Sequence, residues 1–228
     1  MEFVTVCTTP LLISHNNVSY SKGTLFFCIK KDRKMQTKNN TDIIINNKTI
    51  NINYMGNIDL IKTNKISVTG SRESTPEALK ILENNVIKAV KKNYTIVSGY
   101  ARGADETAHY TALKHNGNTI IVLPNGLNSF SVKNIYSNIW NWNNVLVISQ
   151  FNNECGWLTK NAFIRNELII DLSDIIISVH PGSKGGTFGA TNYAFRQNKN
   201  IFITNTNSDG LKFYSNTIDV KDKFKLLD

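Results

Sequence analysis

The chain has 228 residues, 41% of them hydrophobic and 19% charged, and this composition indicates a soluble globular protein large enough for one sizeable domain and an appendage. No stretch approaches the roughly 18–20 apolar residues that a membrane span needs, the N-terminus lacks a basic signal-peptide start, and the three scattered cysteines form no CxxC pair. We therefore expect a cytoplasmic protein with no membrane contact, disulfide framework or metal site. The formal net charge of +9 favours a polyanionic partner, although AT-rich coding bias toward Lys and Asn would give the same excess.

Residues 1–62 indicate a small β-rich N-terminal region. Short β-prone runs occur at Thr24–Ile29 and Asp42–Ile45, and Asn46-Asn47-Lys48 is a suitable turn between two strands. Between the runs, Lys30–Asn40 is polar and charged, so we expect a solvated loop there.

From residue 63 the pattern changes to strands that alternate with helices. Lys65–Thr69 has the composition of a short buried strand, and a helix start follows it, with Thr75 as N-cap and Pro76 at the first helical position. Apolar residues then recur at helical spacing, at Leu79, Leu82, Val86, Ala89 and Val90, and predict the buried face of that helix.

The alternation continues to residue 204. Further strands are predicted at Tyr94–Val97, Thr119–Leu123, Val145–Ser149, Asp174–Val179 and Asn200–Thr204, and further helices at Gly103–Asn116, Asn161–Leu172 and Thr187–Gln197. Buried-type strands separated by helices predict an α/β fold, with a Rossmann-like, mostly parallel sheet covered by helices on both faces. We assign this domain to residues 63–206 and a C-terminal tail to residues 207–228. Ligands of such sheets bind at the carboxyl ends of the strands, near a topological switch point.

The first motif, Gly70-Ser71-Arg72, directly follows the first strand of this domain. A glycine allows a sharp turn, and a hydroxyl with free N–H groups before a helix can hold a phosphate that an arginine contacts as well. The alternative is a plain strand-to-helix turn that carries a surface arginine and binds no ligand.

The second motif runs from Ser98 to Asp105, after the next strand. Its candidate binding residues are Ser98, Gly99, Arg102, Gly103, Asp105 and, on the same helix face, His109. The glycines allow a ligand to approach the backbone closely. Alternatively, Asp105 caps the helix and His109 is structural.

The third motif is the start of a helix, Phe163 to Glu167. Arg165 and Asn166 are positioned to reach a ligand near the strand ends. The alternative is an exposed helix face that carries an Arg-Glu pair.

The fourth motif lies between a strand and a helix, at residues 180–187. Its candidate phosphate-binding residues are Gly182, Ser183, Lys184, Gly185, Gly186 and Thr187. Glycines, hydroxyls and a lysine at such a junction suit phosphate binding by backbone amides. The order is not that of a P-loop, and no GxGxxG fingerprint is present. The alternative is a flexible turn.

Taken in chain order, these motifs resemble those of the DprA/Smf family of DNA processing proteins over roughly residues 52–204. The resemblance rests on Gly70-Ser71-Arg72, on the Ser98–Asp105 block with Ala108-His109, on the strand Gly117–Leu123, on Gly126-Leu127, on Phe163–Glu167, and on the lead-in Tyr54–Asn57. Some positions depart from the family pattern. Glu167 replaces the last arginine of an RNR triplet, Gln150 stands where an acidic residue is usual, and the loop at residues 182–187 reads GSKGGT.

The resemblance implies a protein that binds single-stranded DNA, assists a RecA-type recombinase and forms a homodimer through the Rossmann core. DNA phosphates would then meet Arg72, Arg165 and Lys184, and Tyr100 or Phe163 would stack a base. Only 24 residues follow Thr204, so we expect no winged-helix domain.

Two alternatives share the same fold. One is a protein that binds a nucleotide or a nucleotide-derived signal in the same loops. The other is an enzyme, a LOG-like nucleoside-monophosphate phosphoribohydrolase, which requires a carboxylate near the ribose. No acid follows Gly186-Thr187 within residues 188–191, which leaves Asp105 or Glu154. We therefore predict no catalytic residue and no cofactor. A polynucleotide binder should carry basic residues beyond the pocket, whereas a nucleotide sensor should confine them to it.

Overall fold

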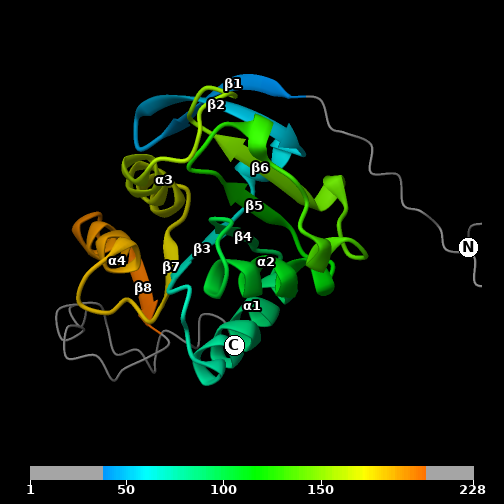
Figure 1. Cartoon of the computed structure of the whole chain (residues 1–228). Coiled ribbons are helices and arrows are strands. Elements are labelled where there is room, and N and C mark those ends of the chain that lie inside the picture. The colour runs from blue at the N-terminus through cyan, green and yellow to red at the C-terminus, as the bar shows by residue number, and fades with distance from the viewer. Residues whose placement is uncertain (1–37, 204–228) are drawn as a thin grey trace, which may run out of the picture. The chain divides into compact units, whose positions relative to one another are not determined.

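Eight strands form one sheet in the computed structural model, which describes residues 38–203 (Figure 1). The spatial order is β1-β2-β6-β5-β4-β3-β7-β8. The strands are β1 (Asn39–Ile45), β2 (Lys48–Gly56), β3 (Lys65–Gly70), β4 (Thr95–Ser98), β5 (Thr119–Val122), β6 (Val145–Ser149), β7 (Ile175–Val179) and β8 (Asn200–Ile203). Strands β3 to β8 pair in parallel, so the predicted Rossmann-like α/β fold is confirmed.

Within the described residues, four α-helices cover the two faces of this sheet. They are α1 (Pro76–Lys91), α2 (Ala104–Lys114), α3 (Thr159–Asp171) and α4 (Gly186–Arg196), and short 3₁₀ helices occur at Ile58–Lys62 (η1), Leu127–Ser129 (η2), Asn134–Tyr136 (η3) and Trp142–Asn144 (η4). Helices α1 and α2 lie on one face, and α3 and α4 lie on the other (Figure 1). All four predicted helices are therefore present, with ends within two residues of the predicted ones.

The alternation of side chains along a strand divides the core between the two faces. In β4, Ile96 packs with α1 and α2, and the next residue, Val97, packs with α3. Both side chains are fully buried. Strands that are buried on both faces are mostly apolar, which explains the short hydrophobic runs in the sequence, and the buried hydroxyls among them form hydrogen bonds, as Ser98 does with the carbonyl of Val68.

Helix α1 begins as the sequence predicts. The Thr75 hydroxyl accepts a hydrogen bond of 3.3 Å from the backbone N–H of Ala78, and Pro76 occupies the first helical position. Along the predicted apolar face, Leu82, Val86 and Ala89 are fully buried, while Leu79 and Val90 are partly buried against the same cluster.

The hairpin of β1 and β2 extends the sheet beyond β6. Asn46 and Asn47 have φ values of +52° and +60°, the left-handed pair that a two-residue type I′ turn requires, and the predicted turn is confirmed. The predicted loop is wrong at its end, because Asn39 and Asn40 belong to β1 and pair with Tyr54 and Asn53.

The predicted strand Thr24–Ile29, the predicted loop up to residue 37 and the predicted tail lie outside the described residues, and the proposed domain boundaries stay predictions. Among residues 38–203, no helix is long and apolar enough to span a membrane.

The order of the strands creates a topological switch point. From β3 the chain proceeds through β4, β5 and β6 on one side, and then through β7 and β8 on the other. The carboxyl ends of β3 and β7, which are neighbours, therefore flank the place where ligands of such sheets usually bind.

Candidate functional site

The turn after β3 is shaped by close packing. A side chain on Gly70 would collide with Ala104 at the start of α2, so a glycine is required there. The Ser71 hydroxyl accepts a hydrogen bond of 3.1 Å from the N–H of Glu73, so this hydroxyl is engaged in the turn itself. The side chain of Arg72 is exposed and lines a pocket at the carboxyl edge of the sheet.

The turn after β4 is organised by Asp105, which is 8% exposed. One carboxylate oxygen lies 2.9 Å from the Ser98 hydroxyl, and the other accepts a hydrogen bond of 3.2 Å from the N–H of Ala101. Gly103 has a φ of +79°, and a side chain there would collide with the backbone of Ser71. The Asp105 carboxylate therefore stabilises the turn after β4 from the buried side, and its oxygens are not directed toward solvent.

His109 is fully buried beneath the same loop. Its Nε2 faces the carbonyl oxygen of Gly99 and its Nδ1 lies 2.7 Å from the Thr119 hydroxyl. Burial lowers the pKa of His109 to about 4, so the ring is neutral at pH 7. Because a carbonyl can only accept, Nε2 carries the hydrogen, while Nδ1 faces the Thr119 hydroxyl, which itself donates a hydrogen bond of 2.9 Å to the carbonyl of Ile96. His109 thus supports the loop at Gly99 from within the core.

Arg165 brings a buried cation from α3 to the same loop. It is 8% exposed, its Nη1 donates a hydrogen bond of 3.1 Å to the carbonyl of Val122, and its guanidinium packs against Gly99. Within residues 38–203 its buried Nε has no hydrogen-bond partner. Burial lowers the pKa of Arg165, and the nearby carboxylate of Asp105 opposes that shift. A buried, incompletely paired guanidinium at a pocket wall is suited to an anionic ligand.

These loops enclose a pocket of about 300 Å³ at the carboxyl ends of β4 and β5. It is lined by Arg72, Tyr100, Ala101, Leu123, Pro124, Asn125, Ser129, Phe130, Ser131, Lys133, Trp157 and Arg165. Three of these residues are cationic, and none of those that the structure describes around the pocket is acidic. The pocket therefore combines positive charge with apolar and aromatic walls.

The aromatic residues of the pocket differ in how far their rings are exposed and engaged in contacts within the protein. The Tyr100 hydroxyl donates to the carbonyl of Ser131 over 3.2 Å and accepts from the N–H of Lys133 over 3.0 Å, and the Lys133 ammonium lies 4.6 Å from the centre of the Tyr100 ring. Phe130 packs against the same ring at 5.2 Å. Burial raises the pKa of Tyr100 to about 12. Trp157, by contrast, is 56% exposed, so it is the aromatic side chain at the pocket that is most available to a ligand.

Lys133 and Trp157 were not predicted as site residues. The Lys133 ammonium also forms an ion pair of 3.0 Å with Glu106, which fixes it beside the pocket. The density of aromatic residues between Phe130 and Trp142, together with Gly126-Leu127, was a signal that this segment folds onto the core.

The glycine-rich loop after β7 lies on the other side of β3. Gly182 and Gly185 have φ values of +63° and +96°, and His180 has a φ of +49°. The N–H of Thr75 donates a hydrogen bond of 3.3 Å to Nδ1 of His180, which joins this loop to the start of α1. Ser183, Lys184, Gly185 and Gly186 are exposed, and Thr187 is half-buried in the first turn of α4.

The predicted site residues therefore fall into three groups. Arg72 and Arg165 line the pocket, with Gly99 packed against the Arg165 guanidinium. Ser98, Asp105 and His109 are buried beneath it. A third group lies at the same carboxyl edge without lining the pocket, and comprises Gly70, Ser71, Arg102, Gly103, Asn166, Gly182, Ser183, Lys184, Gly185, Gly186 and Thr187.

Helix α3 contributes Asn166 and Phe163 to this edge. Asn166 donates a hydrogen bond of 3.3 Å to the carbonyl of Gly186 and so connects α3 to the loop after β7. Phe163 is 48% exposed on α3 but does not line the pocket. Among residues 38–203, no group of three histidine, cysteine or carboxylate side chains is placed to hold a metal ion.

Comparison with known proteins gives a consistent result. The sequence model of the family described as DNA recombination-mediator protein A matches residues 34–222. The chain is 32% identical over 160 residues to DNA processing protein DprA of Streptococcus pneumoniae, which covers 69% of this chain and 56% of that protein. It is 32% identical over 127 residues to protein Smf of Escherichia coli, covering 52% of this chain and 34% of that protein. The chain thus spans about half or less of these relatives.

Two solved structures have the same fold. The first is DNA processing protein A from Helicobacter pylori, described for its single-stranded DNA binding mode, with a TM-score of 0.70, 22% identity, and coverage of 85% of this chain and 96% of that one. The second is DprA from Streptococcus pneumoniae, with a TM-score of 0.63, 27% identity, and coverage of 77% of this chain and 65% of that one.

Proposed function

Because this chain belongs to the DNA recombination-mediator protein A family, also called DprA/Smf, we propose that it binds single-stranded DNA along the carboxyl edge of its sheet. The observation that carries the proposal is the pocket of about 300 Å³, which is lined by the cations Arg72, Lys133 and Arg165 and by the exposed Trp157. Cationic side chains bind the phosphates and an aromatic ring stacks on a base, and this combination allows proteins to bind single-stranded DNA independently of its sequence. The single-stranded DNA binding attributed to the Helicobacter pylori protein supports the proposal.

A polynucleotide fits this edge better than a single nucleotide. Basic side chains continue beyond the pocket, at Arg102 after β4, at Lys160 in the first turn of α3 and at Lys184 after β7, and all three are exposed. A sensor of a mononucleotide would need charge only within the pocket. The spread of charge along the strand ends instead favours several phosphates of one strand.

The hydrolase alternative has less support. Both oxygens of Asp105 are engaged with Ser98 and Ala101, and Glu106 is paired with Lys133. Glu154 is exposed but does not line the pocket. No carboxylate among the described lining residues is therefore available as the acid or base that such chemistry requires.

Partners of the protein are part of the same proposal. Single-stranded DNA bound at the open carboxyl edge of the sheet stays accessible to a second protein, and we propose that a RecA-type recombinase binds this DNA. We also propose that two copies of the chain associate through the Rossmann-like domain. The exposed apolar side chains of Phe163 and Ile164 on α3 support a protein contact on that face. A cytoplasmic location agrees with these roles.

The test is fluorescence anisotropy of a labelled oligo-dT strand with the full chain, at several salt concentrations and with unlabelled duplex as competitor. We expect a preference for the single strand, an affinity that falls steeply with salt, and a loss of about tenfold in Arg72→Ala. Lys48→Ala, which removes an equally exposed cation at the start of β2, is the matched control. Equal binding by Arg72→Ala and wild type, or equal competition by duplex, would refute the proposal.

A further inference from the structure

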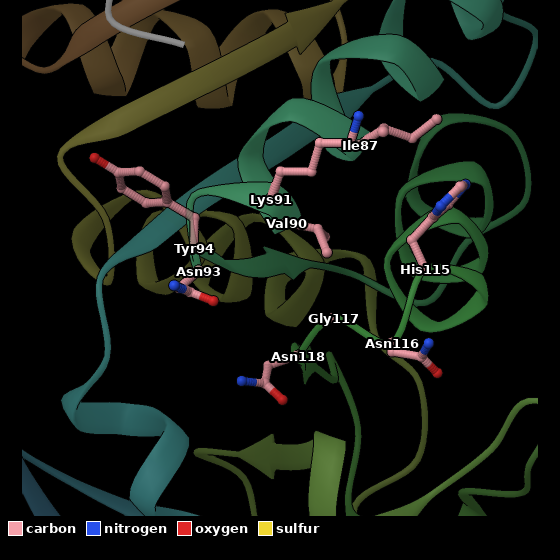
Figure 2. A pocket seen from close by; sticks show the side chains of 9 residues that line it. All are labelled: Ile87, Val90, Lys91, Asn93, Tyr94, His115, Asn116, Gly117 and Asn118. Carbon is pink, nitrogen blue, oxygen red and sulfur yellow. The ribbon is translucent and has the colours of Figure 1, made fainter. Parts of the chain in front are cut away.

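A second pocket lies at the opposite edge of the sheet, between the C-terminal ends of α1 and α2 (Figure 2). Its volume is about 370 Å³, which exceeds that of the pocket at the carboxyl edge. It is lined by Ile87, Val90, Lys91, Asn93, Tyr94, His115, Asn116, Gly117 and Asn118. None of these residues belongs to the site proposed above, so this pocket needs its own explanation.

The pocket arises from the way in which both helices end. Asn93 and Asn116 follow α1 and α2 in the left-handed conformation, with φ values of +61° and +58°, which asparagine adopts more readily than most residues. After α2, the N–H of Gly117 donates a hydrogen bond of 2.8 Å to the carbonyl of Ala112. A side chain on Gly117 would lie 2.8 Å from a methyl group of Val90, so the floor of the pocket is a tight apolar contact.

Amide groups surround this apolar floor. Figure 2 shows the side chains of Asn93, Asn116 and Asn118 around the hollow, with Val90 between them. The Asn118 side-chain oxygen accepts a hydrogen bond of 2.9 Å from Asn144, whereas the side-chain amides of Asn93 and Asn116 form no hydrogen bond with any residue between 38 and 203. Amide groups that face a hollow can both donate to and accept from the edge of a ligand.

The rim of the pocket carries positive charge. Lys91 and His115 line it, and Lys114 lies beside them over the ring of Tyr110. Among residues 38–203, Glu83 interacts with Lys114, and the pKa of Glu83 is lowered first by its hydrogen bond with Lys80. Cations in the last turn of a helix also complement the helix dipole, but that role requires neither the amides nor the hollow.

An apolar floor, amide groups, two rings and a cationic rim match the chemistry of a nucleotide. We propose that this pocket binds one nucleotide, with its base over Val90, the base edge on the amides of Asn93 and Asn116, and the phosphate at Lys91 and His115. The residues Tyr94 and His115 line the hollow on different sides (Figure 2), and Tyr94 also packs against the core formed by α1, α2 and the sheet. The ligand is either a free nucleotide or one unit of a longer strand, since both present the same groups.

The test is a titration of the ¹⁵N-labelled full chain, followed by the backbone amide signals of residues 93 and 116–118. The probes are the four deoxynucleoside monophosphates and, separately, a 20-residue oligo-dT. We expect saturable shifts at these signals. A response to the monophosphates identifies a free nucleotide as the ligand, and a response to the oligonucleotide alone identifies a strand.

Two double variants make the test specific. In Asn93→Asp/Asn116→Asp the size and the tolerance of left-handed backbone are kept while two negative charges enter, so we expect about a tenfold loss of affinity at this pocket. The double variant Lys91→Gln/His115→Gln should also weaken binding at this pocket. With the monophosphates as probes, Lys48→Ala, an exposed substitution at the start of β2, should leave these signals unchanged, and the anisotropy test of Arg72→Ala reports on the proposed DNA site separately. Absent shifts with both probes, or shifts that persist undiminished in both double variants, would overturn the proposal.

Discussion

Arg165 donates a hydrogen bond from Nη1 to the carbonyl oxygen of Val122, and this contact places a cation from α3 across the carboxyl end of β5. The same guanidinium packs against Gly99 at the end of β4. One side chain thus joins two strand ends and one helix at the wall of the pocket.

Replacing Arg165 with lysine should distinguish the contribution of the guanidinium's hydrogen-bonding geometry to DNA affinity from that of its positive charge. The net charge stays constant, but an ammonium has no planar fork with which to hold the Val122 carbonyl and a phosphate together. We expect the affinity for oligo-dT to fall about tenfold. Arg196→Lys, an exposed substitution in the last turn of α4, should leave affinity unchanged. Anisotropy titrations of the two variants at one salt concentration provide the comparison, and equal affinities would contradict the assigned role.

Gly99→Ala should damage the site through a single methyl group. The added carbon would collide with the guanidinium of Arg165 and the carboxylate of Asp105, so one of them must move. We expect a stability loss of about 1–3 kcal/mol together with weaker DNA binding. Gly156→Ala is the control, because nothing lies within 4 Å of the added carbon. Urea denaturation and anisotropy would measure both effects, and identical behaviour of the two variants would be evidence against the packing described.

His109 should make the fold sensitive to acid. Burial lowers its folded-state pKa to about 4 from an ordinary 6.5, so between these values the unfolded chain binds more protons than the folded one. Stability is therefore lost as the pH falls from 6.5 toward 4, and His109 contributes up to about 3 kcal/mol of that loss.

The measurement for His109 is the free energy of unfolding in urea at pH 7 and at pH 4.5. His109→Gln, which does not titrate, should be less stable at pH 7 but should lose less stability on acidification. The difference between the two proteins removes the contribution of the other titrating groups. Parallel pH dependences would show that His109 does not carry the effect.

Trp157 should report on DNA directly. Its exposed ring lines the pocket, whereas Trp140 is 9% exposed and packs edge-on against Trp142 at 5.1 Å. Stacking of a base should quench the Trp157 emission, and Trp157→Ala should lose about 1–3 kcal/mol of binding free energy. Trp157→Phe should retain most of the affinity while the quenching disappears. Quenching that persists in Trp157→Phe would assign the signal to another tryptophan.

Local signals predicted most of the fold. The capping pair Thr75-Pro76, the spacing of Leu82, Val86 and Ala89, and the apolar strands identified their elements because each signal depends on neighbours in the sequence. The family resemblance is confirmed as well by the family model that matches residues 34–222. Two of its motifs, Gly70-Ser71-Arg72 and Ser98–Asp105, lie where β3 and β4 end, which is where the fold brings them together.

The rest of the site depends on contacts between distant residues. Lys133 lies among the short 3₁₀ helices between β5 and β6, and Trp157 lies in the loop between β6 and α3. Neither segment has a helical or a strand period, and Lys133 is held in place by contacts with Tyr100 and Glu106. His109 was predicted as a possible ligand contact because a polar residue on a helix gives no sign that its hydrogen-bond partners are Gly99 and Thr119 in the core.

The bond between Arg165 and Val122 joins residues that are 43 positions apart in the sequence. A contact of this separation forms only when the loop between them has closed, which is slow compared with the formation of a single helix. During refolding, the pocket at the carboxyl edge is therefore assembled only once α3 has docked on the sheet, and a folding intermediate that lacks this docking would have native-like helices without the complete site. Recovery of the binding surface is thus a late marker of folding for this domain, later than recovery of its helical content.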